Sequence, residues 1–219
     1  MERLTVFTAN IGRKDSPGQR EQNIRKVKQG TKELPNVIVG WQEIDEADTG
    51  NEHGMLKEVW PHQRFGAMST AVPVLSNRPV EMYKVQITKT CDGRAQVSPT
   101  RFCVQAILHI GDLRLVHLNG HYPYNAPDLR RECNAKWREI ANLWFDKGWS
   151  IVTTRDTNWH GRMPKLHPRE RLLTPAGAID RITVIEKDIT FRVARRHRIN
   201  LNIDGHDAVG VTLTLKGRK

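Results

Sequence analysis

The stretch that decides the fold is WSIVTTRDTN, residues 149–158. Its first six residues are apolar or β-branched with few exceptions, which predicts a strand over 149–154. Asp156 and Asn158 follow at the tip of that strand. In such places Asp and Asn most often bond the local backbone of a turn, so this stretch alone indicates a turn as readily as a functional site.

Polar residues end several other predicted strands. Alternation predicts a strand over 4–10, and a continuously apolar run predicts another over 36–41. Further strands are expected over 71–75, 80–88, 101–109, 112–118, 179–185, 189–194 and 209–215, with an antiparallel meander over 80–118. The side chains at the strand ends are amides, carboxylates and imidazoles, namely Asn10, Glu43, His121, Asp156, Asn158, Asp180 and His206.

Helices are predicted between these strands. Ser16 and Pro17 open one that Pro35 ends, and a period of three to four residues predicts a longer one over 125–146. A short helix is expected over 53–60. We find no repeat or linker, so 219 residues predict a single domain over 1–219.

The chain is strongly basic. Lys and Arg number 35 against 24 Asp and Glu, which gives a formal charge of +11. This excess favours a partner that carries phosphate, with nucleic acid first, although a solvated basic surface explains the charge about as well. The run 195–198, RRHR, has the same two interpretations: a grip on a nucleic-acid backbone or a solvated hairpin.

The three cysteines, Cys91, Cys103 and Cys133, are too few and too scattered for a disulfide framework or a structural zinc site. No apolar run approaches the length of a membrane span. We therefore expect a soluble, cytoplasmic protein without an obligate protein partner, acting as a monomer.

The polar residues at the strand ends suit one kind of chemistry. Hydrolysis of a phosphodiester needs a cation at the phosphoryl oxygens, a group that orients or deprotonates water, and donors for the developing charge. Carboxylate and amide oxygens are ligands of hard cations. This set of residues provides all three functions.

The order of these motifs resembles the endonuclease/exonuclease/phosphatase family, which includes pancreatic-type deoxyribonucleases and apurinic-site endonucleases. The matching segments are TANI at 8–11, WQEI at 41–44, AVPVLSNRP at 71–79, NGHYP at 119–123, RDTN at 155–158, IDRI at 179–182 and GHDAV at 205–209. The resemblance covers nearly the whole chain. It implies an α/β four-layer sandwich of two mainly antiparallel sheets flanked by helices.

The same resemblance implies roles for the individual residues. Glu43 with Asn10 would hold Mg²⁺ or Mn²⁺, and Asp156 would position water. Asp180 would orient His206, while Asn158 and His121 would contact the phosphate. Residues expected to bind substrate are Arg101, Arg155 and Trp159, the last by stacking on a base.

Two positions depart from the family pattern. Arg155 stands where the family has Gly, and Gly205 replaces an acidic residue, for which Asp204 and Asp207 are the neighbouring substitutes. A weakened metal site is one consequence. The sequence therefore predicts a metal-dependent phosphodiester hydrolase, a nuclease acting on DNA. The alternatives are a phosphatase or phosphodiesterase of a small or lipid phosphate, and a non-catalytic nucleic-acid-binding module.

Overall fold

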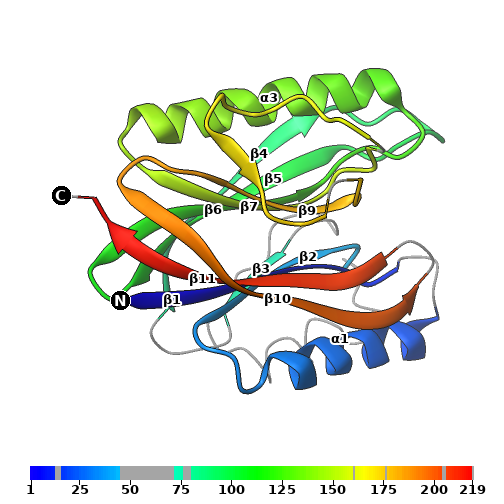
Figure 1. Cartoon of the computed structure of the whole chain (residues 1–219). Helices are drawn as coiled ribbons and strands as arrows, with labels where there is room; N and C mark the ends of the chain where they lie inside the picture. The colour runs from blue at the N-terminus through cyan, green and yellow to red at the C-terminus, as the bar shows by residue number, and fades with distance from the viewer. Residues whose placement is uncertain are drawn as a thin grey trace.

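The computed structural model describes residues 1–12, 16–44, 72–75, 80–159, 161–175, 177–203 and 206–218. Two β-sheets pack face to face in this part of the chain, and a helix covers the outer face of each (Figure 1). This arrangement confirms the α/β sandwich predicted from the sequence.

The first sheet has the strand order β10-β11-β1-β2-β3. Its strands are β1 (Glu2–Asn10), β2 (Val37–Gln42), β3 (Val72–Leu75), β10 (Ile189–Ile203) and β11 (His206–Gly217). Only β1 and β2 pair in parallel among these neighbours. The sheet is therefore mixed but mainly antiparallel.

The second sheet has the order β4-β5-β6-β7-β9-β8. Its strands are β4 (Val80–Cys91), β5 (Arg101–Ile110), β6 (Leu113–His121), β7 (Ser150–Asp156), β8 (Glu170–Leu172) and β9 (Asp180–Ile185). Here β6 and β7 are the parallel neighbours, and the expected meander is β4-β5-β6.

Alternation along the strands distributes the apolar side chains between the layers. In β1, Val6 faces the core between the sheets, whereas Phe7 faces α1 (Pro17–Thr31). On the other side, Trp137 on α3 (Pro127–Asp146) packs on the outer face of the second sheet. Successive residues of a strand point to opposite faces, so each sheet is covered on both sides.

The structure differs most from the sequence prediction at two strands. β10 runs to Ile203, nine residues past the predicted end, and β8 was not predicted. β10 is an edge strand whose second half is largely exposed, so it lacks the apolar alternation that reveals a half-buried strand. The predicted short helix over 53–60 lies outside the described residues. No helix within the described ranges has the length and apolar character needed to span a bilayer.

Candidate active site

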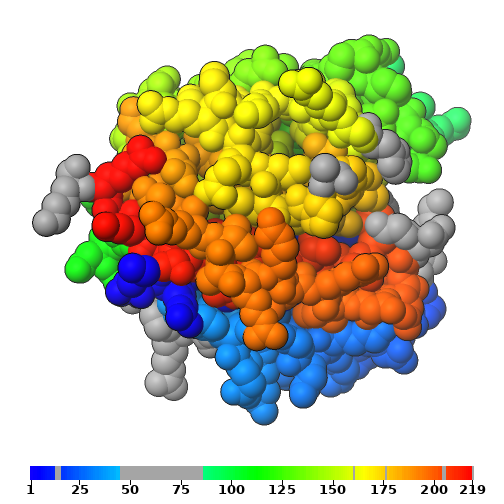
Figure 2. Space-filling model, viewed as in Figure 1, coloured from blue at the N-terminus to red at the C-terminus, as the bar shows by residue number. Residues whose placement is uncertain are grey.

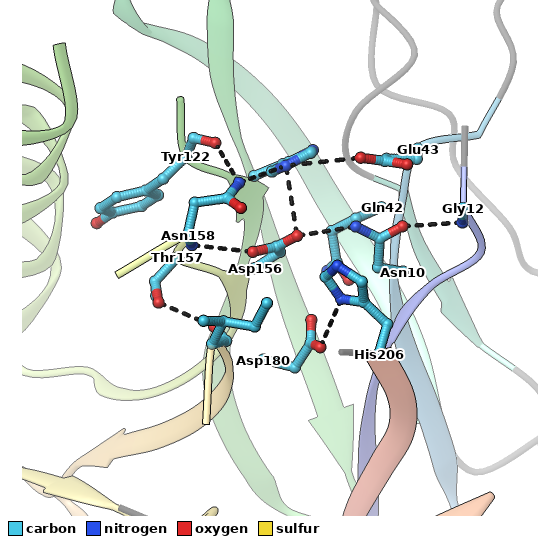
Figure 3. A network of polar contacts seen from close by, with 12 residues as sticks. Asn10, Gly12, Gln42, Glu43, Tyr122, Asp156, Thr157, Asn158, Asp180 and His206 are labelled. Atoms are coloured by element: carbon cyan, nitrogen blue, oxygen red, sulfur yellow. Dashed lines mark hydrogen bonds and ion pairs between the residues drawn. The ribbon is translucent and has the colours of Figure 1, made fainter. Parts of the chain in front are cut away.

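The predicted polar residues meet at one end of the two sheets (Figure 3). Asn10, His121 and Asp156 end β1, β6 and β7, while Asp180 and His206 begin the antiparallel strands β9 and β11. The carboxyl ends of parallel neighbours share one sheet edge, and antiparallel neighbours begin at that same edge. The sheet topology therefore brings together residues that are far apart in the sequence.

Asp156 lies at the centre of this cluster, with an exposed fraction of 1%. Its Oδ2 accepts from Asn10 Nδ2 at 2.8 Å, and its Oδ1 accepts from the Asn158 amide at 3.0 Å. Burial, followed by the charge of Asp180, raises the pKa of Asp156 to about 7, although His206 and the two donors act against this rise. Asp156 is thus a carboxylate suited to take up a proton near neutral pH.

His206 and Asp180 form a second unit beside Asp156. Nδ1 of His206 lies 2.9 Å from Oδ2 of Asp180, which is the cross-strand neighbour of Asp156. Burial alone would lower the pKa of His206, but the hydrogen bond and charge of Asp180, together with Asp156 and Glu43, raise it to about 9. His206 is therefore held as a cation with Nδ1 directed at Asp180.

His121 lies on the other side of Asp156. A donor lies at each ring nitrogen of His121: Arg101 Nη1 is 3.2 Å from Nδ1, and Asn158 Nδ2 is 2.9 Å from Nε2. This Nε2 lies 3.4 Å from Asp156 Oδ2 and 3.9 Å from Glu43 Oε1. The imidazole of His121 therefore lies between two carboxylates on one side and the Arg101 guanidinium on the other.

The backbone at two site residues occupies a conformation that few L residues adopt. Glu43 has φ 63° and Asn158 has φ 46°. Arg20 Nη2 donates to the Glu43 carbonyl at 3.1 Å, and Asn158 Nδ2 donates to the Tyr122 carbonyl at 2.9 Å. Such backbone strain is common at functional sites, where neighbouring contacts hold it in place.

The carboxylates of this cluster fit a divalent cation. Oxygen atoms of Asp156 and Asp180 lie within 4.8 Å of each other and of a ring nitrogen of His206. Asp180 Oδ1 is buried and accepts no hydrogen bond from the described residues, and burial raises the pKa of Asp180 despite its bond to His206. A nearby cation would offset this crowding of carboxylates. Metal binding by Glu43 and Asn10 stays a prediction, since the Asn10 oxygen here accepts from the Gly12 amide at 2.9 Å.

A buried polar network between the two sheets lies next to the site, and it was not predicted from the sequence. Gln42 Nε2 donates to Asn119 Oδ1 at 2.8 Å, which joins the two sheets, and Thr154 Oγ1 donates to the same oxygen at 2.9 Å. Gly40 leaves the space for this contact, because a Cβ there would overlap Thr154 and Asn119. Polar residues inside otherwise apolar strands were the available signal.

Two predicted substrate contacts lie elsewhere. Arg155 is 1% exposed and points to the opposite face of β7, where its Nη2 lies 2.6 Å from Glu170 Oε1. The expected phosphate contact of Arg155 at this site is therefore wrong. Trp159 packs beside the apolar cluster under α3, near the guanidinium of Arg130, so it does not join the strand-end cluster. Gly205 lies outside the described residues.

Comparison with known proteins shows the fold. The chain matches an endonuclease/exonuclease/phosphatase from Bacteroides vulgatus with a TM-score of 0.75 at 14% identity, covering 99% of this chain and 100% of that one. It also matches D. rerio TDP2 complexed with a single-strand DNA product, with a TM-score of 0.72 at 13% identity and coverage of 97% and 99%. This protein has the endonuclease/exonuclease/phosphatase fold.

A third solved structure with this fold is a mannosyl-6-phosphatase from Bacteroides thetaiotaomicron. Its TM-score is 0.68 at 14% identity, and the match covers 97% of this chain and 99% of that one. No family model and no curated protein sequence matches the chain. At these identities the likeness establishes the fold, and the activity has to be argued from the site.

Proposed function

We propose that this protein is a divalent-metal-dependent phosphodiesterase that cleaves nucleic acid, with DNA as the substrate. The observation that carries the proposal is the meeting of Asp156, the Asp180–His206 pair and the Arg101–His121 pair at one end of the sandwich. These groups correspond to a base for water, an oriented cation and a donor for phosphoryl oxygen.

In this proposal each side chain has a separate task. Asp156, held by Asn10 and Asn158, orients water and accepts its proton. His206, kept protonated by Asp180, stabilises charge on the phosphoryl oxygens. Mg²⁺ or Mn²⁺, held by Glu43 with the neighbouring carboxylates, would supply further neutralisation of the phosphate when bound.

Arg101 and His121 act together on the substrate side. Arg101 is 5% exposed, and its contact with His121 Nδ1 holds the imidazole beside the carboxylates of the site. The buried guanidinium also adds positive charge beside the proposed phosphate position, because it contacts the His121 ring. We assign these two residues to phosphate binding.

The charge of the chain favours a polyanionic substrate. The net charge is +11, and β10 exposes Arg192, Arg195, Arg196 and Arg198 along an open sheet edge. Residues that contact successive phosphates give nucleic-acid binding its affinity and its salt dependence. A compact phosphate ester would not need a basic edge of this length.

The test incubates the purified chain with supercoiled plasmid, linear DNA, RNA and small phosphate esters, with Mg²⁺, with Mn²⁺ and with a chelator. We expect cleavage of DNA that the chelator abolishes. Release of phosphate from small esters with intact polynucleotide would support a phosphatase instead. Salt-sensitive DNA binding without turnover on any substrate would support a binding module.

A further inference from the structure

Next to the carboxylate pair of the active site, the same two strands carry a pair of arginines on the opposite face of the sheet. Asp156 and Asp180 are cross-strand neighbours on β7 and β9, and so are Arg155 and Arg181, one residue along. Because successive residues alternate, the two arginines lie on the face away from the carboxylates. The Arg155 guanidinium lies 5.5 Å from the Trp137 ring centroid, which places it under α3.

Arg155 has a carboxylate partner. Glu170 Oε1 accepts from Arg155 Nη2 at 2.6 Å, and both side chains are almost fully buried, at 2% and 6% exposed. Glu170 also accepts from Thr183 Oγ1 at 2.7 Å and from the Leu166 amide at 2.6 Å. The acceptor capacity of this carboxylate is therefore largely used.

Arg181 has no comparable partner. It is 6% exposed, and its bonds go to three backbone carbonyls, those of Ala178, Trp159 and Gly161. Its Nη1 makes no hydrogen bond within the described part of the chain, and no carboxylate there pairs with it. Burial, and then the charge of Arg155, lowers the pKa of Arg181. The charge of Glu170 acts against this lowering, but Glu170 is already paired with Arg155. Two buried cations then share one carboxylate, so an anion at this place would be stabilising.

A cavity of about 760 Å³ opens above these two arginines. The segment 161–175 that borders it lies at the surface between α3 and β10, in yellow in Figure 2. Arg162 and Lys165 add two exposed cations to its wall, and Glu170 is the one acidic residue of the lining among the described residues. Apolar wall is provided by Met163, Pro164 and Leu172.

We propose that this cavity is a second binding site, separate from the active site, for a phosphate-bearing ligand of nucleotide size. Arg181, Arg162 and Lys165 bind the phosphate, and the apolar wall contacts the organic part. The volume lies within the range of roughly 300–1,000 Å³ found for small-molecule sites. Arg181 also donates to the carbonyls of Trp159 and Gly161, which follow the active-site residue Asn158. A ligand bound to Arg181 would therefore contact the side chain that holds this segment.

Calorimetric titration with adenosine 5′-monophosphate at fixed ionic strength tests this site. The whole chain carries His206→Ala, which weakens phosphate binding at the active site. We expect saturable binding that adenosine does not reproduce. Arg162→Ala with Lys165→Ala should lower the affinity about tenfold, a free-energy change of about 1.4 kcal/mol. Leu172→Glu, which places a carboxylate on the wall, should lower it at least as much.

The matched control removes two exposed charges elsewhere, by Lys28→Ala with Arg138→Ala. The proposal predicts affinity within twofold of the parent for this control. An equal loss in both double variants, or binding that His206→Ala alone abolishes, would overturn the second site.

A second titration identifies the source of the phosphate. A 5′-phosphorylated oligonucleotide that binds as well as the nucleotide assigns the cavity to the 5′ ends of nucleic-acid chains. A preference for the nucleotide assigns it to a free ligand. None of these results depends on cleavage activity.

Discussion

Nδ1 of His206 lies 2.9 Å from Oδ2 of Asp180, and this one contact joins β11 of the first sheet to β9 of the second. The contact fixes the orientation of the imidazole as well as its charge. Because Asp180 is also the cross-strand neighbour of Asp156, a change at Asp180 should alter the protonation of the whole cluster.

Asp180→Asn should lower the pKa of His206 from about 9 towards its ordinary value of 6.5, because the bond and charge that favour the imidazolium are reduced. Titration of the His206 ring signals by NMR, without metal, measures this directly. Asp207→Asn is the control, since Asp207 on β11 pairs with Arg198 on β10 and is not among the main causes of the shift. An unchanged His206 titration in Asp180→Asn would contradict the pairing.

Asp156→Asn should abolish most hydrolysis while leaving DNA affinity within a few-fold, because the carboxylate acts on water and does not hold the substrate backbone. The amide keeps the size of the side chain and retains an acceptor for the Asn158 amide. Cleavage rate and DNA binding are measured on the same folded preparation, with exposed Asp112→Asn as control. Cleavage at the parental rate would remove Asp156 from its assigned role.

The positions of the site residues were accessible from the sequence because strand ends are local features. Asp156 and His206 follow or open apolar alternation, so their place at a sheet edge could be read without tertiary information. The distance between them could not, since β7 and β11 belong to different sheets. Only the resemblance to known proteins paired Asp180 with His206.

Arg155 shows where the sequence reasoning stopped short. The alternation rule already places Arg155 and Asp156 on opposite faces, which argues against a shared site. Its partner could not be found, because Glu170 begins the three-residue strand β8, which has no periodic pattern of its own. The cavity under that segment was equally hidden from the sequence.

Gly40→Ala should destabilise the protein by about 1–3 kcal/mol, because the added Cβ would overlap the Thr154 hydroxyl and the Asn119 amide in the network below the site. Gly18→Ala in α1 is the matched control, since no atom lies within 4 Å of a Cβ there. That variant should be unchanged or gain up to about 1 kcal/mol in stability. Urea unfolding at pH 7 compares the two variants. Equal stabilities would contradict the prediction, because they would show that the two sheets accommodate the added methyl group at Gly40 without cost.

His117 predicts how stability depends on pH. Its side chain is fully buried on β6, where the ring Nε2 lies 2.8 Å from Thr154 Oγ1, and burial lowers its pKa from 6.5 to about 3. In the unfolded chain His117 therefore takes up a proton near pH 6.5, whereas in the folded chain it takes up this proton only near pH 3. The contribution of neutral His117 to stability is fully present above pH 6.5 and is lost progressively as the pH falls towards 3.

Each pH unit below 6.5 should thus cost the folded state about 1.4 kcal/mol from this group, which amounts to about 2 kcal/mol at pH 5. His117→Gln removes the titration and keeps a polar group near Thr154. Urea unfolding at pH 7 gives the packing cost of the substitution, and the same measurement at pH 5 should show a smaller loss for the variant than for the parent. Parallel losses from pH 7 to pH 5 would mean that the folded protein accommodates a charged His117, contrary to its burial between the two sheets.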